Sequence, residues 1–102
     1  MKGLKSRRDI EIDFMRACRQ SEELMEISSG LVKIAGSGLE DTMLLLRRSF
    51  KGNNAELFYN KAEKLKNELL EDAEELANVA GSIYAMANVV YEAEMKALEM
   101  VC

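Results

Sequence analysis

The sequence predicts an all-α protein in which two long antiparallel helices form a helical hairpin. The 102 residues contain no proline and are rich in Ala, Leu, Glu, Lys and Met, a composition that favours helices. Apolar residues recur at heptad-like intervals in two segments of similar length, which is the pattern of amphipathic helices. Between these segments, residues 50–53 interrupt the pattern cleanly. We therefore expect a single domain over residues 1–102, with its turn near the middle of the chain.

The first helix is predicted over residues 13–49, with Asp13 as its N-cap. Residues 1–12 are assigned to a tail and a short lead, because a basic chain start is more often a solvated, disordered segment than a phosphate-binding arm. A heptad-like stripe along the helix is expected to face the core. Its members are Phe14, Cys18, Ser21, Met25, Ser28, Val32, Ala35, Leu39, Thr42 and Leu46, and a flanking row of Ala17, Leu24, Leu31, Gly38 and Leu45 widens it.

Three glycines, Gly30, Gly36 and Gly38, weaken the middle of this first helix, each by about 1 kcal/mol relative to alanine. One interpretation breaks the helix here and gives a three-helix protein. We favour a continuous helix, with room for a kink, because the stripe appears in the same phase on both sides of the glycines. The small residues either let another helix approach closely or provide local flexibility.

The turn is predicted at residues 50–53, followed by a second helix over 54–100. Gly52 can adopt a positive φ without steric cost, so it can end one helix and reverse the chain. Asn53 is a good N-cap, and Glu56 completes a start of the capping-box type. Counted outward from Gly52, the C-terminal part of the second helix extends beyond the start of the first.

The second helix carries two apolar rows with a seven-residue repeat, the spacing of a left-handed helical bundle. Asp72 is the one polar residue in the second of these rows. We expect it to lie at the edge of the seam, and favour this over the alternative that it fixes the register of the paired helices. The first row is Ala55, Ala62, Leu69, Leu76, Ile83, Val90 and Ala97, the second is Phe58, Leu65, Val79, Met86, Ala93 and Met100, and a further row beside them is Leu70, Ala73, Ala80 and Ala87.

The apolar face of the second helix is wider than one neighbouring helix can cover. A single hairpin offers each helix only one neighbour, so it leaves part of both faces exposed to water. Pairing two hairpins would cover these faces. The sequence therefore predicts dimerisation into a four-helix bundle, either with a second copy or with a similar small protein.

Composition argues against most other function classes. The chain has no histidine, which excludes Ser-His-Asp and Cys-His nucleophile pairs and removes the commonest metal ligand. The cluster Glu71, Asp72, Glu74 and Glu75 lacks the supporting ligands of a carboxylate metal site. A net charge of −4 disfavours nucleic acid as a partner. We expect a non-enzymatic protein without a cofactor or a metal.

Export and redox features of the sequence are few. No apolar run approaches the length of a membrane span, and the charged start lacks the apolar core of a cleaved signal peptide. The protein is expected to be synthesised in the cytoplasm, without membrane insertion, and to be secreted without a cleaved leader if it is exported. Cys18 and Cys102 are too far apart in a hairpin for an intrachain disulfide.

The central stretch resembles the WXG, or ESAT-like, family of small proteins exported by bacterial type VII secretion systems. Members of that family are helical hairpins of similar length with Trp-x-Gly at the bend, followed by a small residue and then an aromatic residue one turn on. The corresponding residues here are Phe50, Gly52, Ala55 and Phe58, with phenylalanine in place of tryptophan. The resemblance covers residues 10–95.

The resemblance implies a type VII secretion substrate or partner that acts through helix-bundle dimerisation. The partner would be a second copy or another small WXG-like protein, with a larger secreted effector or the secretion ATPase as further partners. The family's export signal, Tyr-x-x-x-Asp/Glu, is degenerate here, because Tyr91 is followed four residues on by Met95, with Glu94 one residue earlier. This chain would then be the signal-less member of a heterodimer.

Two alternatives stay open. Tyr91 can equally be a packing residue at the seam beside Val90. The whole chain can also be a cytoplasmic coiled-coil adaptor or chaperone with no link to secretion, which a neighbouring gene for a secretion ATPase would argue against.

Overall fold

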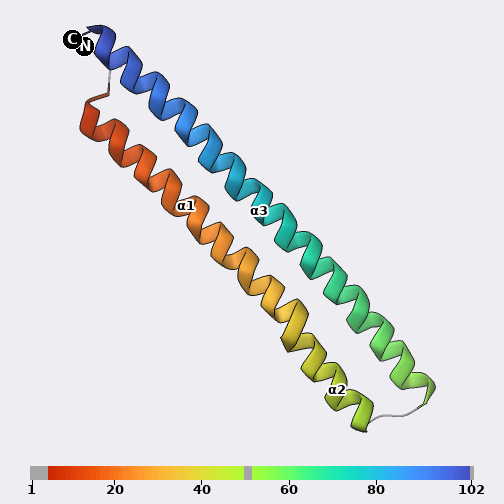
Figure 1. Ribbon diagram of the computed structural model, residues 1–102. Helices are drawn as coiled ribbons and strands as arrows, with labels where there is room; N and C mark the ends of the chain where they lie inside the picture. The colour runs from red at the N-terminus through yellow and green to blue at the C-terminus, as the bar shows by residue number, and fades with distance from the viewer. Residues whose placement is uncertain (1–4, 50–51, 102) are drawn as a thin grey trace. The chain divides into compact units, whose positions relative to one another are not determined.

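The computed structural model of the protein describes residues 5–49 and 52–101, which are helical except at Lys5, Ser6 and Gly52 and contain no strand (Figure 1). Helix α1 spans Arg7–Lys33, the π-helix η1 spans Ile34–Gly38, α2 spans Leu39–Ser49 and α3 spans Asn53–Val101. The predicted all-α class is confirmed. The predicted second helix, 54–100, differs from α3 by one residue at each end. Pairing of two hairpins into a bundle stays a prediction.

The chain divides into two compact units, one made from two stretches of sequence and the other from a single stretch. The terminal unit combines Met1–Met25 with Asn78–Cys102, and the bend unit is Glu26–Ala77. In the terminal unit Phe14 packs on Tyr91 and Ser21 bonds to Ala80, so residue numbers rise on one helix as they fall on the other. The bend unit shows the same order in the pairs Ser28–Ala73 and Glu40–Lys66. We call α1, η1 and α2 together the first arm and α3 the second arm. Within each unit the two arms are therefore antiparallel, as the hairpin prediction requires.

The first helix begins at Arg7 and not at Asp13, so the predicted tail and lead over residues 1–12 are wrong for the residues from Arg7 onward. Ser6 is the cap: its Oγ accepts a hydrogen bond from the backbone N–H of Asp9 at 3.1 Å, and its carbonyl accepts one from the N–H of Ile10 at 3.0 Å. Asp9 also places a negative charge in the first turn, where the helix dipole favours it. A serine cap with an acidic residue three positions later stabilises a helix start, and the prediction overlooked it.

Small side chains form the seam between the arms in both units. Ser21 Oγ donates a 2.8 Å hydrogen bond to the carbonyl of Ala80 in the terminal unit. Ser28 Oγ donates a 2.7 Å bond to the carbonyl of Ala73 in the bend unit. A carbonyl oxygen has two lone pairs, so it can accept such a bond in addition to its helical one. These bonds require close approach of the backbones, and all four residues are buried.

This seam differs from the predicted one on the first arm. Ser21, Ser28 and Ala35 of the predicted stripe are buried, and Phe14 is half-buried. Three further members, Cys18, Leu39 and Leu46, are half-buried as well, whereas Met25, Val32 and Thr42 are exposed. Their place is taken by the row that was predicted only to flank the stripe, whose half-buried members in α1 are Ala17, Leu24 and Leu31.

On α3 one predicted row lies at the seam between the arms and the other does not, and burial of the second row in a dimer stays a prediction. Ala55 is buried and Leu69, Leu76 and Ile83 are half-buried, as predicted, whereas Val90 is half exposed. The second row lies outward: Phe58 is 57% exposed, Leu65 47%, Val79 49% and Met86 67%. Ala73 and Ala80 are buried in its place. Close approach at the serine–carbonyl contacts admits alanine and excludes the larger side chains. Asp72 is exposed beside the seam, as predicted.

The π-helix η1 shifts the seam by one residue. An uninterrupted heptad from Ser28 and Leu31 would bring Gly38, Thr42 and Leu45 to the seam. Instead the half-buried residues after η1 are Leu39, Met43 and Leu46, each one position later. A π turn accommodates one extra residue, which accounts for the shift. The first arm stays helical through the glycines, as predicted. The prediction that the apolar stripe keeps the same heptad phase on both sides of the glycines is wrong.

Candidate functional site

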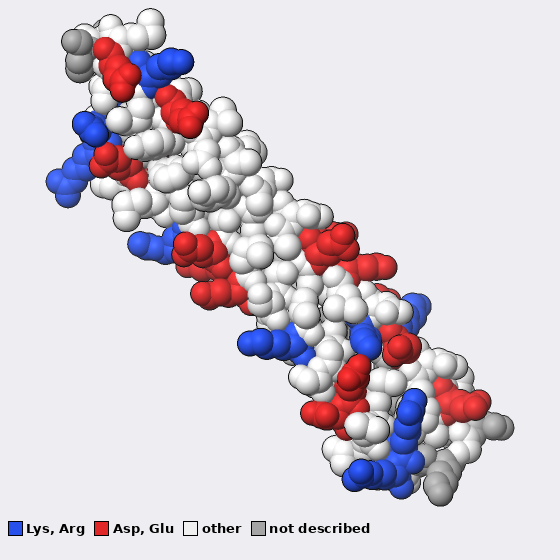
Figure 2. Space-filling model, in the orientation of Figure 1, with Lys and Arg blue, Asp and Glu red and all other residues white. Residues whose placement is uncertain are grey.

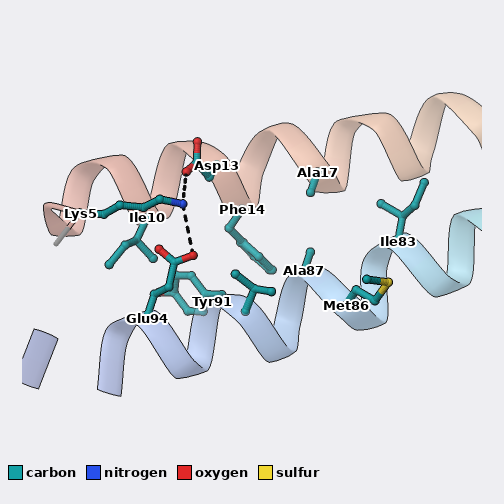
Figure 3. Close-up of a pocket in the computed structure, with 11 residues that line it drawn as sticks. Lys5, Ile10, Asp13, Phe14, Ala17, Ile83, Met86, Ala87, Tyr91 and Glu94 are labelled. Atoms are coloured by element: carbon teal, nitrogen blue, oxygen red, sulfur yellow. Dashed lines mark hydrogen bonds and ion pairs between the residues drawn. The ribbon is translucent and has the colours of Figure 1, made fainter. Parts of the chain in front are cut away.

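The two residues of the degenerate export motif, Tyr91 and Glu94, lie together in the terminal unit. The ring of Tyr91 packs on the ring of Phe14, with centroids 4.7 Å apart and an interplanar angle of 36°. Glu94 Oε1 lies 3.3 Å from Lys5 Nζ, and the same amino group lies 3.0 Å from Asp13 Oδ2. Lys5 therefore bridges a carboxylate near the start of the chain to one on α3 (Figure 3).

A cavity of about 300 Å³ adjoins these residues. Its walls are mostly apolar and its charged residues are Lys5, Asp13 and Glu94 (Figure 3). The apolar lining consists of Ile10, Phe14, Ala17, Ile83, Met86, Ala87, Val90 and Tyr91. One ammonium between two carboxylates leaves the charged part of the lining with one excess negative charge.

The electrostatics of this cluster fix the protonation of Lys5. Its hydrogen bond to Asp13, and secondly its bond to Glu94, raise the pKa of Lys5 above the ordinary 10.5. The ammonium form is thus favoured by the fold. Lys5 lies in the predicted solvated tail and is exposed, but its side chain forms ion pairs that the prediction did not include. Both Tyr91 and Glu94 are occupied by contacts inside their own unit, in line with the packing alternative for Tyr91.

The bend motif is described in part, because Phe50 lies outside the described residues. Gly52 has φ of +112°, the conformation predicted for it, and its carbonyl accepts hydrogen bonds from the N–H groups of Ala55 and Glu56. Ala55 is buried at the start of α3. Phe58, by contrast, is exposed and does not complete a packed bend.

Phe58 borders a second cavity, of about 260 Å³, in the bend unit. Leu46, Asn54, Ala55 and Tyr59 complete its lining. The guanidinium of Arg47 lies 5.4 Å from the centroid of the Tyr59 ring, a cation–π distance. The hydroxyl of Tyr59 is buried and has no hydrogen-bond partner among the residues that the structure describes. The sequence offered no signal for the Arg47–Tyr59 pair, because the two residues lie on opposite sides of the turn.

Large apolar side chains remain exposed on the outer sides of both arms. On the face drawn in Figure 2, charged side chains border stretches that carry no charge. In the bend unit the exposed set comprises Ile27, Val32, Ile34, Leu44, Leu45, Leu57, Phe58, Leu65 and Leu70.

The described ranges contain no group of three or more Cys, Asp or Glu side chains placed to hold a metal ion. Within those same ranges, no helix combines the length and the apolar character that crossing a membrane requires. A scan against protein-family models, a search of curated proteins and a search of solved structures each found no match to this chain.

Proposed function

We propose that this chain is a non-enzymatic helical partner protein of the WXG kind, which acts in type VII secretion by pairing with another helical hairpin. The observation that carries the proposal is the exposed row Phe58, Leu65, Val79 and Met86 on α3. These residues repeat every seven positions, the spacing with which one helix packs on another. The fully buried positions of the seam are mostly alanine and serine, so this row of larger side chains is left for another chain.

The link to secretion rests on the bend and on the C-terminal motif. Gly52 reverses the chain with a positive φ at the position that the family resemblance assigns to its glycine. Tyr91 and Glu94 contact Phe14 and Lys5, which favours a chain that is exported with a partner over one that presents its own signal. We propose synthesis in the cytoplasm and secretion without a cleaved signal peptide.

The test is export that depends on the secretion ATPase. The tagged chain is expressed in the organism that encodes it, and culture supernatants are compared with and without a functional ATPase, with a cytosolic enzyme as the lysis control. Loss of the chain from the supernatant of the ATPase mutant is expected. Retention of all of the chain in the cells of both strains would instead favour a cytoplasmic adaptor or chaperone.

A further inference from the structure

The outer row of α3 carries an acidic interruption that bears on the choice of partner. Asp72 occupies the row position between Leu65 and Val79 and is exposed. It belongs to an acidic segment, 68–75, that contains five carboxylates and no basic residue. None of these carboxylates forms an ion pair with any residue in the described ranges.

The acidic side chains are not spread evenly around the helix. Glu68, Asp72 and Glu75 follow Leu65 by three, seven and ten residues, and those spacings place them on the side of the helix that carries the row. Glu71 and Glu74 follow Leu65 by six and nine residues, which turns them away from it. A helix that packs on the row therefore meets three carboxylates.

We propose that the outer row of α3, Phe58–Leu65–Asp72–Val79–Met86, binds an amphipathic helix of a different chain. That helix presents apolar residues seven apart and a lysine or arginine opposite Asp72. This inference rests on the helix-pairing part of the proposed function and names the partner of the same surface.

Symmetry disfavours a second copy as the occupant. The apolar members of the row lie evenly on both sides of Asp72. A two-fold pairing of identical helices that covers the whole row, whether parallel or antiparallel, therefore places Asp72 against its own copy. The acidic segments of the two copies then face one another, and like charges across an interface oppose association. A basic partner reverses the sign of this interaction.

The bend unit also offers a place for an apolar side chain of that partner. The cavity of about 260 Å³ beside Phe58 is lined by Leu46, Ala55 and Tyr59. It lies two heptads before Asp72 along α3. A partner helix aligned with its basic residue at Asp72 would thus bring an apolar residue of its own row near this cavity.

The experiment uses the full chain and two synthetic peptides of equal length. Both peptides carry leucines at heptad spacing, and they differ only in having lysine or glutamate at the position opposite Asp72. At low salt the lysine peptide is expected to bind at least about tenfold more tightly than the glutamate peptide. Added salt should reduce this difference in affinity, because it screens the charges. Fluorescence anisotropy measures both affinities.

Substitutions locate the surface. Phe58→Ala combined with Leu65→Ala should abolish binding of the lysine peptide. Leu70→Ala should not, because Leu70 is exposed and lies about 140° around the helix from Leu65. Asp72→Asn should remove the preference between the peptides, and Glu71→Gln should keep it. Far-ultraviolet circular dichroism checks that each variant is folded.

Light scattering of the isolated chain separates the outcomes. A monomer that becomes a dimer on Asp72→Leu supports the proposal, because that change completes the apolar row and removes the repulsion. A wild-type dimer that Phe58→Ala and Leu65→Ala dissolve would overturn the different-chain partner and leave helix pairing intact. A monomer that binds neither peptide would overturn helix pairing itself, and with it the proposed function.

Discussion

Ser21 and Ala80 are 59 residues apart in the sequence and are joined by a 2.8 Å hydrogen bond from the serine hydroxyl to the alanine carbonyl. The same arrangement recurs seven residues along each helix, in the bend unit, between Ser28 and Ala73. A hydroxyl that bonds to the backbone of the opposite helix leaves no space for a longer side chain on either side. The alanines of α3 are therefore required for their size.

Replacement of a seam alanine should be costly. Ala80→Leu places a branched side chain where the residue is fully buried, and overpacking of this kind costs about 1–3 kcal/mol. Urea unfolding measures the free energy of unfolding. Ala85→Leu, on the exposed side of the same unit, is the control and should change stability by less than about 0.5 kcal/mol. Equal losses for both variants would contradict the close seam.

Deletion of Gly36 from the π-helix should be tolerated, although a deletion inside a helix usually is not. Removing one residue lets α1 run into α2 as an ordinary α-helix and keeps Leu39, Met43 and Leu46 in the seam. It also removes a glycine that costs about 1 kcal/mol in a helix. Deletion of Glu26, an exposed residue of the same unit, is the control, because it turns Ser28 and Leu31 off the seam. Thermal melting should be nearly unchanged in the first variant and strongly lowered in the second, and the reverse order would refute the one-residue shift.

Replacing two exposed glycines by alanine should change the free energy of unfolding in opposite directions. Gly52→Ala should destabilise the protein by about 1–2 kcal/mol, because φ is +112° there and an added Cβ meets no atom within 4 Å. The cost is therefore backbone strain alone. Gly81→Ala, within α3 and equally free of contacts, should stabilise by about 0.5–1 kcal/mol. Denaturant midpoints give both values, and a gain at both positions would argue against the turn.

The ion pairs of Lys5 should give stability that is lost in strong alkali. The pKa of Lys5 is raised above 10.5 in the fold, so the folded state holds this proton more tightly than the unfolded state does. The stabilisation is fully present below 10.5 and disappears as the pH rises through the higher folded value. The melting temperature of wild type should exceed that of Lys5→Met slightly at neutral pH, and the two should converge in strong alkali. A difference that disappears near neutral pH would show that other groups cause it.

The sequence predicts the helical class, the turn at Gly52 and one of the two rows on α3, because heptad spacing and glycine conformation are local properties. It does not reveal which second row is buried. Phe58, Leu65 and Met86 are more apolar than Ala73 and Ala80, so a hydrophobicity criterion selects them. The choice depends on the distance between the helices, which Ser21 and Ser28 set from the other arm. The extra residue of η1 is equally hidden, because Leu39 and Leu46 fit an unbroken heptad with the exposed Val32 as well as they fit the shifted seam.

For the candidate site, the sequence singles out Tyr91 and Glu94 but not what they contact. Lys5 is 89 residues from Glu94, and no spacing rule connects positions so distant. The cap at Ser6 was available as a local signal, since Asp9 follows it by three residues. A cap at Ser6 places Lys5 immediately before the helix and within reach of Asp13.

The separation between Lys5 and Glu94 also bears on how the chain folds. Closing a loop costs entropy that grows with its length, and the Glu40–Lys66 pair spans only 26 residues. The difference in closure entropy is about 1 kcal/mol in favour of the shorter loop. Contacts between the two arms should therefore form first near the turn and then successively toward the chain ends. Amide hydrogens near the ends should then exchange first with deuterated solvent, and those near the turn last.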